Sequence, residues 1–577
     1  MEERKGSRKV RKKQSWIVNP YLLLLIYSSL LTIVSYISIN TSSQIYDYPF
    51  HMARIVGLAQ SIANGDYLPN LNFLFTHGSG YAVPMFYGNF MLYLPALVFL
   101  VTKVGTFAFT SYAFIIIVTT TWTSYYSLYQ ITQDSKKSVL FGMTMATVLP
   151  YFGFGMSAAL PYIPFLIYCI YKVLFMERLN PIPLGITIAL LVQTHIISTV
   201  VLAISSAIFV IFTLNKLSLK KIHSFVKSIV IAIVLSTGFI LQYLEQNNSQ
   251  TFFVSWGLRD YPFPTVTILA PGNLFEVLTN YYFPLSLLFL LVGLILFKRL
   301  KHISRALLLT AVSLLLIASD ILPWQSVLRF TFLTVFQYTE RLIYFLPAFI
   351  IMALFIADVK YLAKMLTVAQ IAFYLITNPL TFLPNASPYK EKYGLVASNI
   401  EVMRAQNTQA TNAYMDPYHT TYWTSGDEYF NLAINHDQVT DGTINQFIYD
   451  ASKVSVENIT QSYNNLEFDV ILTNQDENAT ITLPRIWYKG YTAVYTNGAD
   501  GTQPEIEYID LTNEELQQYE EAYKPSETTK ALHNGQATIQ IEESGHVRIT
   551  YSKTKNQIIG FSVQCVAWLL LAAYLIL

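Results

Sequence analysis

Apolar runs about as long as a bilayer is thick dominate this chain and restrict what it can fold into. The 577 residues are 53% hydrophobic and only 13% charged, which is too apolar for one soluble domain. The sequence therefore predicts an α-helical polytopic membrane protein. We expect twelve spans, near residues 17–39, 106–131, 139–160, 161–176, 184–197, 198–214, 228–245, 281–297, 306–320, 341–357, 361–382 and 557–577.

Basic residues predict the orientation of these spans. Residues 1–16 are rich in Arg and Lys, and loops between alternate spans also carry them. Because positively charged loops remain in the cytoplasm, we expect both termini inside. The first run is too long for the core of a signal peptide, so we interpret it as a retained span. The expected parts are a basic N-terminus at 1–16, a membrane module at 17–382 with outer loops at 40–105 and 246–280, an outer domain at 383–556, and a last span at 557–577.

Two apolar runs do not fit simple spans. The run at 84–104 is bounded by Pro, which favours a surface or re-entrant element. The run at 184–214 is long for one span, so we expect it to split into a short hairpin, with a single tilted helix as the alternative.

Residues 383–556 predict a separate extracytoplasmic domain. Acidic residues outnumber basic ones there, so the charge pattern reflects topology and does not indicate nucleic-acid binding. Short β-rich runs such as Phe468–Leu472 and Val547–Tyr551 are separated by Asn-Gly, Asp-Gly and Ser-Gly turns, which predicts a β-sandwich. Cys169 and Cys565 both lie in apolar runs, so neither a disulfide framework nor a Cys-based metal site is expected.

The strongest candidate site follows the first apolar run. Asp47, His51 and Arg54 are spaced so that they share one face of a helix, which we expect to lie at the membrane surface. A carboxylate there is suited to act as a general base, an imidazole to transfer a proton, and a guanidinium to hold a phosphate. The alternative is that Asp47 only caps a helix beginning near Pro49.

Three further polar residues extend this candidate site. His195 interrupts an apolar run, and burying it costs free energy unless it faces a cavity or a partner. Arg259 lies in the second outer loop, and Arg341 lies at an outer membrane boundary where it is placed to bind a lipid phosphate. For boundary charges, the alternative roles are snorkelling and helix capping. We assign no metal ligand, because one Asp-x-x-x-His pattern is insufficient; a divalent metal cofactor remains open.

The segment from Asp47 to Arg54, with Pro84-Met-Phe-Tyr87 downstream, resembles the YfhO-like and 6-pyruvoyl-tetrahydropterin-synthase-related families of bacterial polytopic membrane proteins. These families are similar to C-type (GT-C) glycosyltransferases, whose first outer loop supplies a catalytic acid at the position of Asp47. The resemblance implies a bacterial plasma-membrane enzyme. It would move a sugar from a polyprenyl-phosphate lipid to a cell-envelope glycopolymer or glycolipid at the outer face.

The resemblance also implies roles for the candidate residues. Asp47 and His51 would be catalytic, while Arg54, His195, Arg259 and Arg341 would bind substrate. Two alternatives remain open: a transporter or flippase for lipid-linked sugars, and a non-catalytic membrane scaffold that presents the outer domain.

Overall fold

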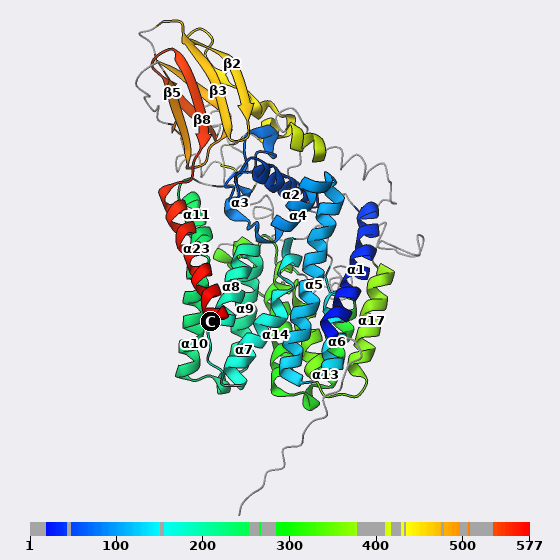
Figure 1. Ribbon diagram of the computed structural model, residues 1–577. Coiled ribbons are helices and arrows are strands. Elements are labelled where there is room, and N and C mark those ends of the chain that lie inside the picture. Colours follow the sequence, from blue (N-terminus) through cyan, green and yellow to red (C-terminus); the bar gives the residue numbers. More distant parts are fainter. Residues whose placement is uncertain are drawn as a thin grey trace, which may run out of the picture.

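The structure is a helical bundle that carries a β-domain at one end. The computed structural model describes residues 19–42, 48–149, 155–250, 252, 265–266, 284–328, 331–377, 410–416, 428–431, 434, 436–474, 478–496, 506–507 and 535–577. Figure 1 shows the short helices of the first outer segment between the bundle and the strands. These short helices are α2 (Tyr48–Ala63), α3 (Val83–Phe86) and α4 (Tyr93–Thr102).

The bundle packs around α16 (Leu346–Ile356), in which every residue is buried. Such an apolar helix is stable only in a protein core or a membrane. Its other helices are α1 (Pro20–Ser42), α5 (Gly105–Thr132), α6 (Ser135–Met145), α7 (Tyr162–Phe175), α8 (Ile182–Thr194), α9 (Ile196–Ile211), α10 (Leu219–Leu235), α11 (Thr237–Asn247), α13 (Pro284–Ile295), α14 (His302–Ala318), α15 (Glu340–Ile343), α17 (Leu362–Thr377) and α23 (Lys555–Ile576).

The lengths of these helices support a membrane protein but not a count of twelve spans. Within the described ranges, α5 and α23 are each long and apolar enough to cross a membrane, and α10 with α11 forms a third candidate that is bent by 72°. The other helices offer apolar stretches of 10–17 described residues, such as Pro20–Val34 of α1. The twelve spans and their orientation therefore stay predictions, whereas the helical module followed by a β-rich domain is confirmed.

The two ambiguous runs both contain breaks. Residues 84–104 form α3 and α4 with a loop between them. The run at 184–214 ends one helix at Thr194 and begins the next at Ile196, because His195 has an extended backbone (φ −159°, ψ 108°). The second run is thus two helices and not one tilted helix.

The bend between α10 and α11 is held by side chains of other helices. The Leu235 carbonyl accepts hydrogen bonds from Trp568 Nε1 at 3.0 Å and from Gln193 Nε2 at 3.2 Å. The Gly238 backbone N–H donates to Gln564 Oε1 at 3.0 Å. Because backbone groups freed at membrane depth need partners inside the protein, these bonds allow the helix to break there.

Helix α23 lies directly against α11 at two glycines. A Cβ atom at Gly560 would lie 3.0 Å from Gly238 Cα, and one at Gly238 would lie 2.9 Å from Phe561 Cα. Small residues of this kind allow membrane helices to approach closely. Most apolar side chains of α23 are exposed, including Val566 and Leu569, while Ala567, Trp568 and Leu571 pack against α8 and α10.

Replacing Gly560 with leucine should loosen α23. The new side chain meets the Gly238 backbone, and overpacking of this kind costs about 1–3 kcal/mol. We expect a lower thermal unfolding midpoint in detergent, measured by intrinsic fluorescence. The matched control is Val563→Leu on the exposed side of the same helix; equal midpoints for the two variants would contradict the close crossing.

The β-domain consists of two four-stranded antiparallel sheets within the described residues, in the orders β1-β4-β7-β6 and β2-β3-β8-β5. Strand β3 buries alternate residues, and β8 opposes it with Phe468 paired to Val547. The buried faces of both sheets belong to one hydrophobic cluster, as expected for a sandwich. The strands are β1 (Ile448–Tyr449), β2 (Val454–Ser462), β3 (Asn465–Leu472), β4 (Ala479–Ile486), β5 (Tyr491–Thr496), β6 (Ile506–Glu507), β7 (Gln536–Ile541) and β8 (Gly545–Tyr551).

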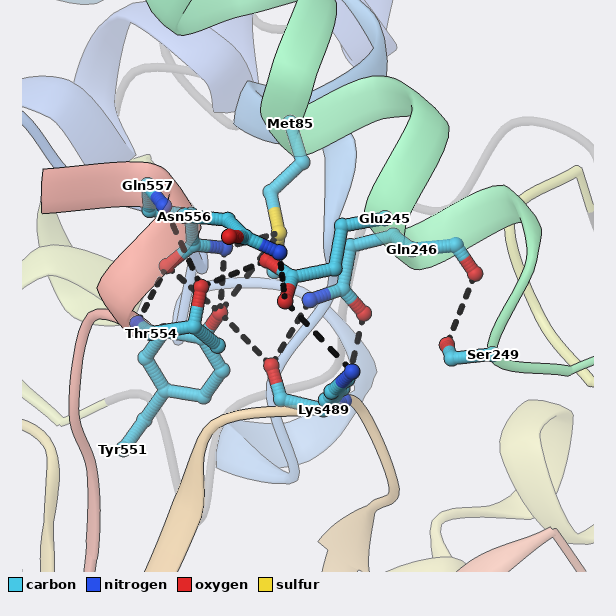
Figure 2. Close-up of polar contacts among 9 residues, drawn as sticks. All are labelled: Met85, Glu245, Gln246, Ser249, Lys489, Tyr551, Thr554, Asn556 and Gln557. Carbon is cyan, nitrogen blue, oxygen red and sulfur yellow. Dashed lines mark hydrogen bonds and ion pairs between the residues drawn. The ribbon is translucent and has the colours of Figure 1, made fainter. Parts of the chain in front are cut away.

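A polar network joins this domain to the bundle (Figure 2). The Glu245 side chain of α11 is 7% exposed, accepts hydrogen bonds from Thr554 Oγ1 and Asn556 Nδ2, and pairs with Lys489 Nζ at 3.4 Å. Gln246 exchanges two hydrogen bonds with the Lys489 backbone, at 2.7 and 3.1 Å. The β4–β5 turn, the start of α23 and the bent helix are therefore tied together.

Candidate functional site

Helix α2 is buried within the protein, and its location at the membrane surface stays a prediction. His51 and Arg54 are each 2% exposed. Every residue from Phe50 to Ser61 is buried, so α2 has no exposed face along these residues. The predicted helix is correct, but the first outer segment and the β-domain enclose it (Figure 1).

The Arg54 side chain is held by a loop of its own segment. Its Nη2 donates to the carbonyls of Gly88 at 2.8 Å and Tyr87 at 3.2 Å, and its Cζ lies 3.8 Å from the Tyr87 ring centroid. Its Nη1 donates to His51 Nδ1 at 3.3 Å, which confirms that the two residues share a helix face. Arg54 Nε is buried and has no acceptor within the described ranges. A buried guanidinium is thus bound by carbonyls and a ring.

Two glycines make this packing possible. A Cβ at Gly88 would lie 1.5 Å from the Gln193 carbonyl oxygen, where the loop presses against the end of α8. A Cβ at Gly155 would lie 1.7 Å from the Tyr87 hydroxyl oxygen and 3.2 Å from His51 Cε1. Residues from three separate parts of the chain therefore meet around the Tyr87 ring.

His51 is a neutral hydrogen-bond donor at physiological pH. Burial, reinforced by the positive charge of Arg54, lowers the pKa of His51 well below its usual value. Because Nδ1 accepts from Arg54, the proton of the neutral ring lies on Nε2. His51 can therefore donate one hydrogen bond, and in this enclosed position it takes up a second proton only with difficulty.

His195 also contacts the Tyr87 ring. Its ring centroid is 5.0 Å from that of Tyr87, and the His51 centroid is 5.8 Å away. His195 caps α9: its Nδ1 accepts from the backbone N–H and the hydroxyl of Ser198, at 3.0 and 2.8 Å. The proton of neutral His195 is therefore on Nε2, which makes no hydrogen bond within the described part of the chain.

Arg341 supplies a second positive charge near Tyr429. Its Cζ lies 4.5 Å from the Tyr338 ring centroid, and its Nη1 is buried without an acceptor among the described residues. Burial and then Glu428 raise the pKa of Tyr429, whereas the positive charges of Arg54 and Arg341 both lower it. Both guanidinium groups are thus close enough to act on one phenol.

The structure brings together His51, Arg54, His195 and Arg341, whereas Asp47 and Arg259 lie outside the described residues. Asp47 immediately precedes α2 in the sequence.

The sequence analysis assigned no role to Tyr87, Gly88 or Tyr429. The Tyr-Gly pair at 87 and 88 is a weak signal of close packing. Nothing in the sequence points to Tyr429, which comes from the outer domain.

The site is closed in this conformation. The space beside Arg54, bounded in part by Gly57, Asn72 and Asn89, is too narrow for a water molecule. In the part of the chain that the structure covers, no three His, Cys, Asp or Glu side chains lie together in a group that would hold a metal ion. The arrangement instead offers two cations and two neutral imidazole N–H groups, a set of donors suited to an anion.

His51 should make stability depend on pH. Since its pKa is lowered in the folded protein, the unfolded chain binds a proton below about pH 6.5 that the folded chain does not. The stabilisation that comes from keeping His51 neutral is fully present above that pH. It is lost as the pH falls, by up to about 1.4 kcal/mol per pH unit. We expect the unfolding midpoint of His51→Gln to fall less between pH 7.5 and 5 than that of the parent protein.

The exposed residue His223 on α10 gives a matched control. His223→Gln should keep the parental pH dependence. A parental dependence in His51→Gln as well would mean that His51 is not held neutral by its surroundings.

Comparisons with known proteins give a weak likeness to solved structures. No family model matches the chain, and no curated protein matches it. Among solved structures, the chain is similar to ArnT from Cupriavidus metallidurans bound to undecaprenyl phosphate. The two are 10% identical, the TM-score is 0.42, and the alignment covers 68% of this chain and 70% of ArnT. A likeness of this size does not establish a shared activity.

Proposed function

We propose that the protein is a membrane glycosyltransferase. It moves a sugar from a polyprenyl-phosphate-linked donor to a cell-envelope glycopolymer or glycolipid at the outer face of a bacterial plasma membrane. One observation supports this most: the charges of Arg54 and Arg341 both act on His195 and Tyr429, and each arginine has a buried nitrogen without an acceptor in the described ranges.

Two guanidinium groups in this environment favour an anionic ligand. A buried cation is costly unless it is paired or hydrogen-bonded. Among the described residues no carboxylate forms an ion pair with Arg54 or Arg341. A phosphate would compensate both charges and accept the remaining N–H groups. Lipid-linked sugars present such a phosphate at the membrane boundary.

The two arginines have different roles in this proposal. Arg54 already binds the Gly88 and Tyr87 carbonyls and His51, so it is a positioning residue that fixes the Tyr87 loop. Arg341 is half-buried, and its Nη1 is unengaged within the described residues. Arg341 is therefore the better ligand for the phosphate, and His195 Nε2–H is a second donor.

The reaction is a displacement at the anomeric carbon of the donor. Asp47 removes the proton of the acceptor hydroxyl, the acceptor oxygen bonds to the anomeric carbon, and the bond from that carbon to the phosphate oxygen breaks. The polyprenyl phosphate leaves with the bonding electrons. Arg341 stabilises its new negative charge, which is the larger part of what the protein must supply.

A transfer assay tests this function directly. The protein in nanodiscs is incubated with polyprenyl-phosphate sugars and envelope glycopolymers, and products are identified by mass spectrometry. We expect transfer by the parent and none by Asp47→Asn. Transfer by Asp47→Asn at the parental rate would remove Asp47 from the mechanism. If neither protein transfers sugar but both bind the lipid, transport or scaffolding is favoured instead.

Arg341→Gln should reduce kcat/KM for sugar transfer about 100-fold, because loss of a single charge-stabilising donor typically has an effect of this order. Arg54→Gln should in addition lower the unfolding midpoint, because the Tyr87 loop loses its guanidinium contacts.

Arg305→Gln is the matched control. Arg305 donates to the Phe297 and Lys298 carbonyls and contacts neither the candidate site nor the β-domain. An Arg341→Gln variant as active as Arg305→Gln would exclude Arg341 from phosphate stabilisation.

A further inference from the structure

A polar groove lies at the seam between the first outer segment and the β-domain, separate from the buried Arg54 site. It encloses about 420 Å³ and opens to solvent. Its walls include Asn64, Asp66 and Asn70 from the loop that follows α2, and Tyr463, Asn464 and Asn465 from the β2–β3 hairpin. Figure 1 shows this sheet above α2. The volume falls in the range of small-molecule sites.

One side chain of the groove has an unfilled hydrogen bond. Asn70 is 2% exposed, and its Nδ2 donates to Gln242 Oε1 at 3.1 Å. Its Oδ1 is buried and receives no hydrogen bond from any described residue. An unpaired buried acceptor of this kind costs about 1–3 kcal/mol.

The charges lining the groove are already paired. Asp66 forms an ion pair with Lys553 at 3.5 Å and accepts a hydrogen bond from the Tyr463 hydroxyl at 3.0 Å. Arg548 pairs with Glu467 at 3.4 Å. Because Arg548 and Lys553 each have an acidic partner, the groove has little net charge to attract an anion. This distinguishes it from the Arg54 and Arg341 cluster.

Amides and aromatic rings together suit a ligand with many hydroxyl groups. Asparagine amides both donate and accept hydrogen bonds, as sugar hydroxyls do. The Phe73 and Tyr463 rings meet edge to face, with centroids 5.3 Å apart, and both line the groove, giving it an apolar wall for the carbon face of a sugar ring. We propose that this groove binds a neutral saccharide. That the saccharide is the acceptor of the transferred sugar rests on the function proposed above; the binding itself does not.

Gly65 provides a way to block the groove. It lines the groove with φ +80°, and a Cβ there would have no neighbour within 4 Å. Asparagine tolerates this backbone region better than other non-glycine residues. Gly65→Asn should therefore keep the fold while placing a side chain in the open space. Thr480→Asn, on an exposed position of the other sheet, is the matched control.

The experiment measures binding of maltotriose and chitotriose to the full-length protein in nanodiscs, without lipid donor, by saturation-transfer NMR and titration. We expect binding by the parent and by Thr480→Asn, at least tenfold weaker binding by Gly65→Asn, and no competition by inorganic phosphate. Tyr463→Leu, which removes the aromatic wall, gives the same test if Gly65→Asn does not fold.

Each other outcome overturns the proposal. If neither trisaccharide binds the parent, or if both blocking variants bind normally, the groove is not a saccharide site; competition by phosphate would make it an anion site. Because no sugar transfer is measured, this result is independent of the glycosyltransferase assay. Saccharide binding without sugar transfer would support the groove as a saccharide site and would reject the proposed function.

Discussion

The hydrogen bonds from Arg54 to the Tyr87 and Gly88 carbonyls are the contact on which the end of the helical bundle next to the β-domain depends. They bury a positive charge in a largely apolar helix, and they fix a loop against the end of α8. Carbonyl oxygens and a ring face solvate the guanidinium only in part, since Nε has no acceptor among the described residues. The same contact holds the Tyr87 ring between His51 and His195. The charge and the hydrogen-bond donors of the proposed site are therefore consequences of how this loop packs.

The β-domain completes that arrangement from above. Its Tyr429 ring stacks on Phe86 with centroids 4.8 Å apart, and the Tyr81 hydroxyl donates to the Glu428 carbonyl. Glu245 and Gln246 tie the domain to the bent helix at a second position. These two attachments restrict how the domain can move. If the enclosed site admits a lipid phosphate, the first outer segment or the β-domain has to shift, because the space beside Arg54 is too narrow for water.

Local patterns in the sequence predicted local structure well. The spacing of His51 and Arg54 predicted a shared helix face, and alternating residues predicted the strands around Phe468 and Val547. The run at 184–214 was expected to split between residues 197 and 198, and it splits slightly earlier, at His195. Each of these depends on neighbours within a few residues. The burial of α2 was not predictable in this way, because it depends on a β-domain that lies hundreds of residues away in the sequence.

The same limit applies to the candidate site and to the membrane topology. Tyr429 and Gly155 reach the site through tertiary packing, and no local pattern marks them. Apolar runs indicated membrane helices, but bends and breaks such as that between α10 and α11 leave few helices that are long enough to span alone. Hydrophobicity reports where a segment is buried, and side chains such as Gln193 and Gln564 decide where it bends.

The central claim is that the cluster beneath the β-domain binds the phosphate of a lipid carrier. Its most direct test is a cryo-electron-microscopy structure of the protein in nanodiscs with a saturating polyprenyl phosphate. The account predicts phosphate density within hydrogen-bonding distance of Arg341 Nη1, with His195 Nε2 facing it. Lipid phosphate bound elsewhere, with Arg341 still unengaged, would contradict it.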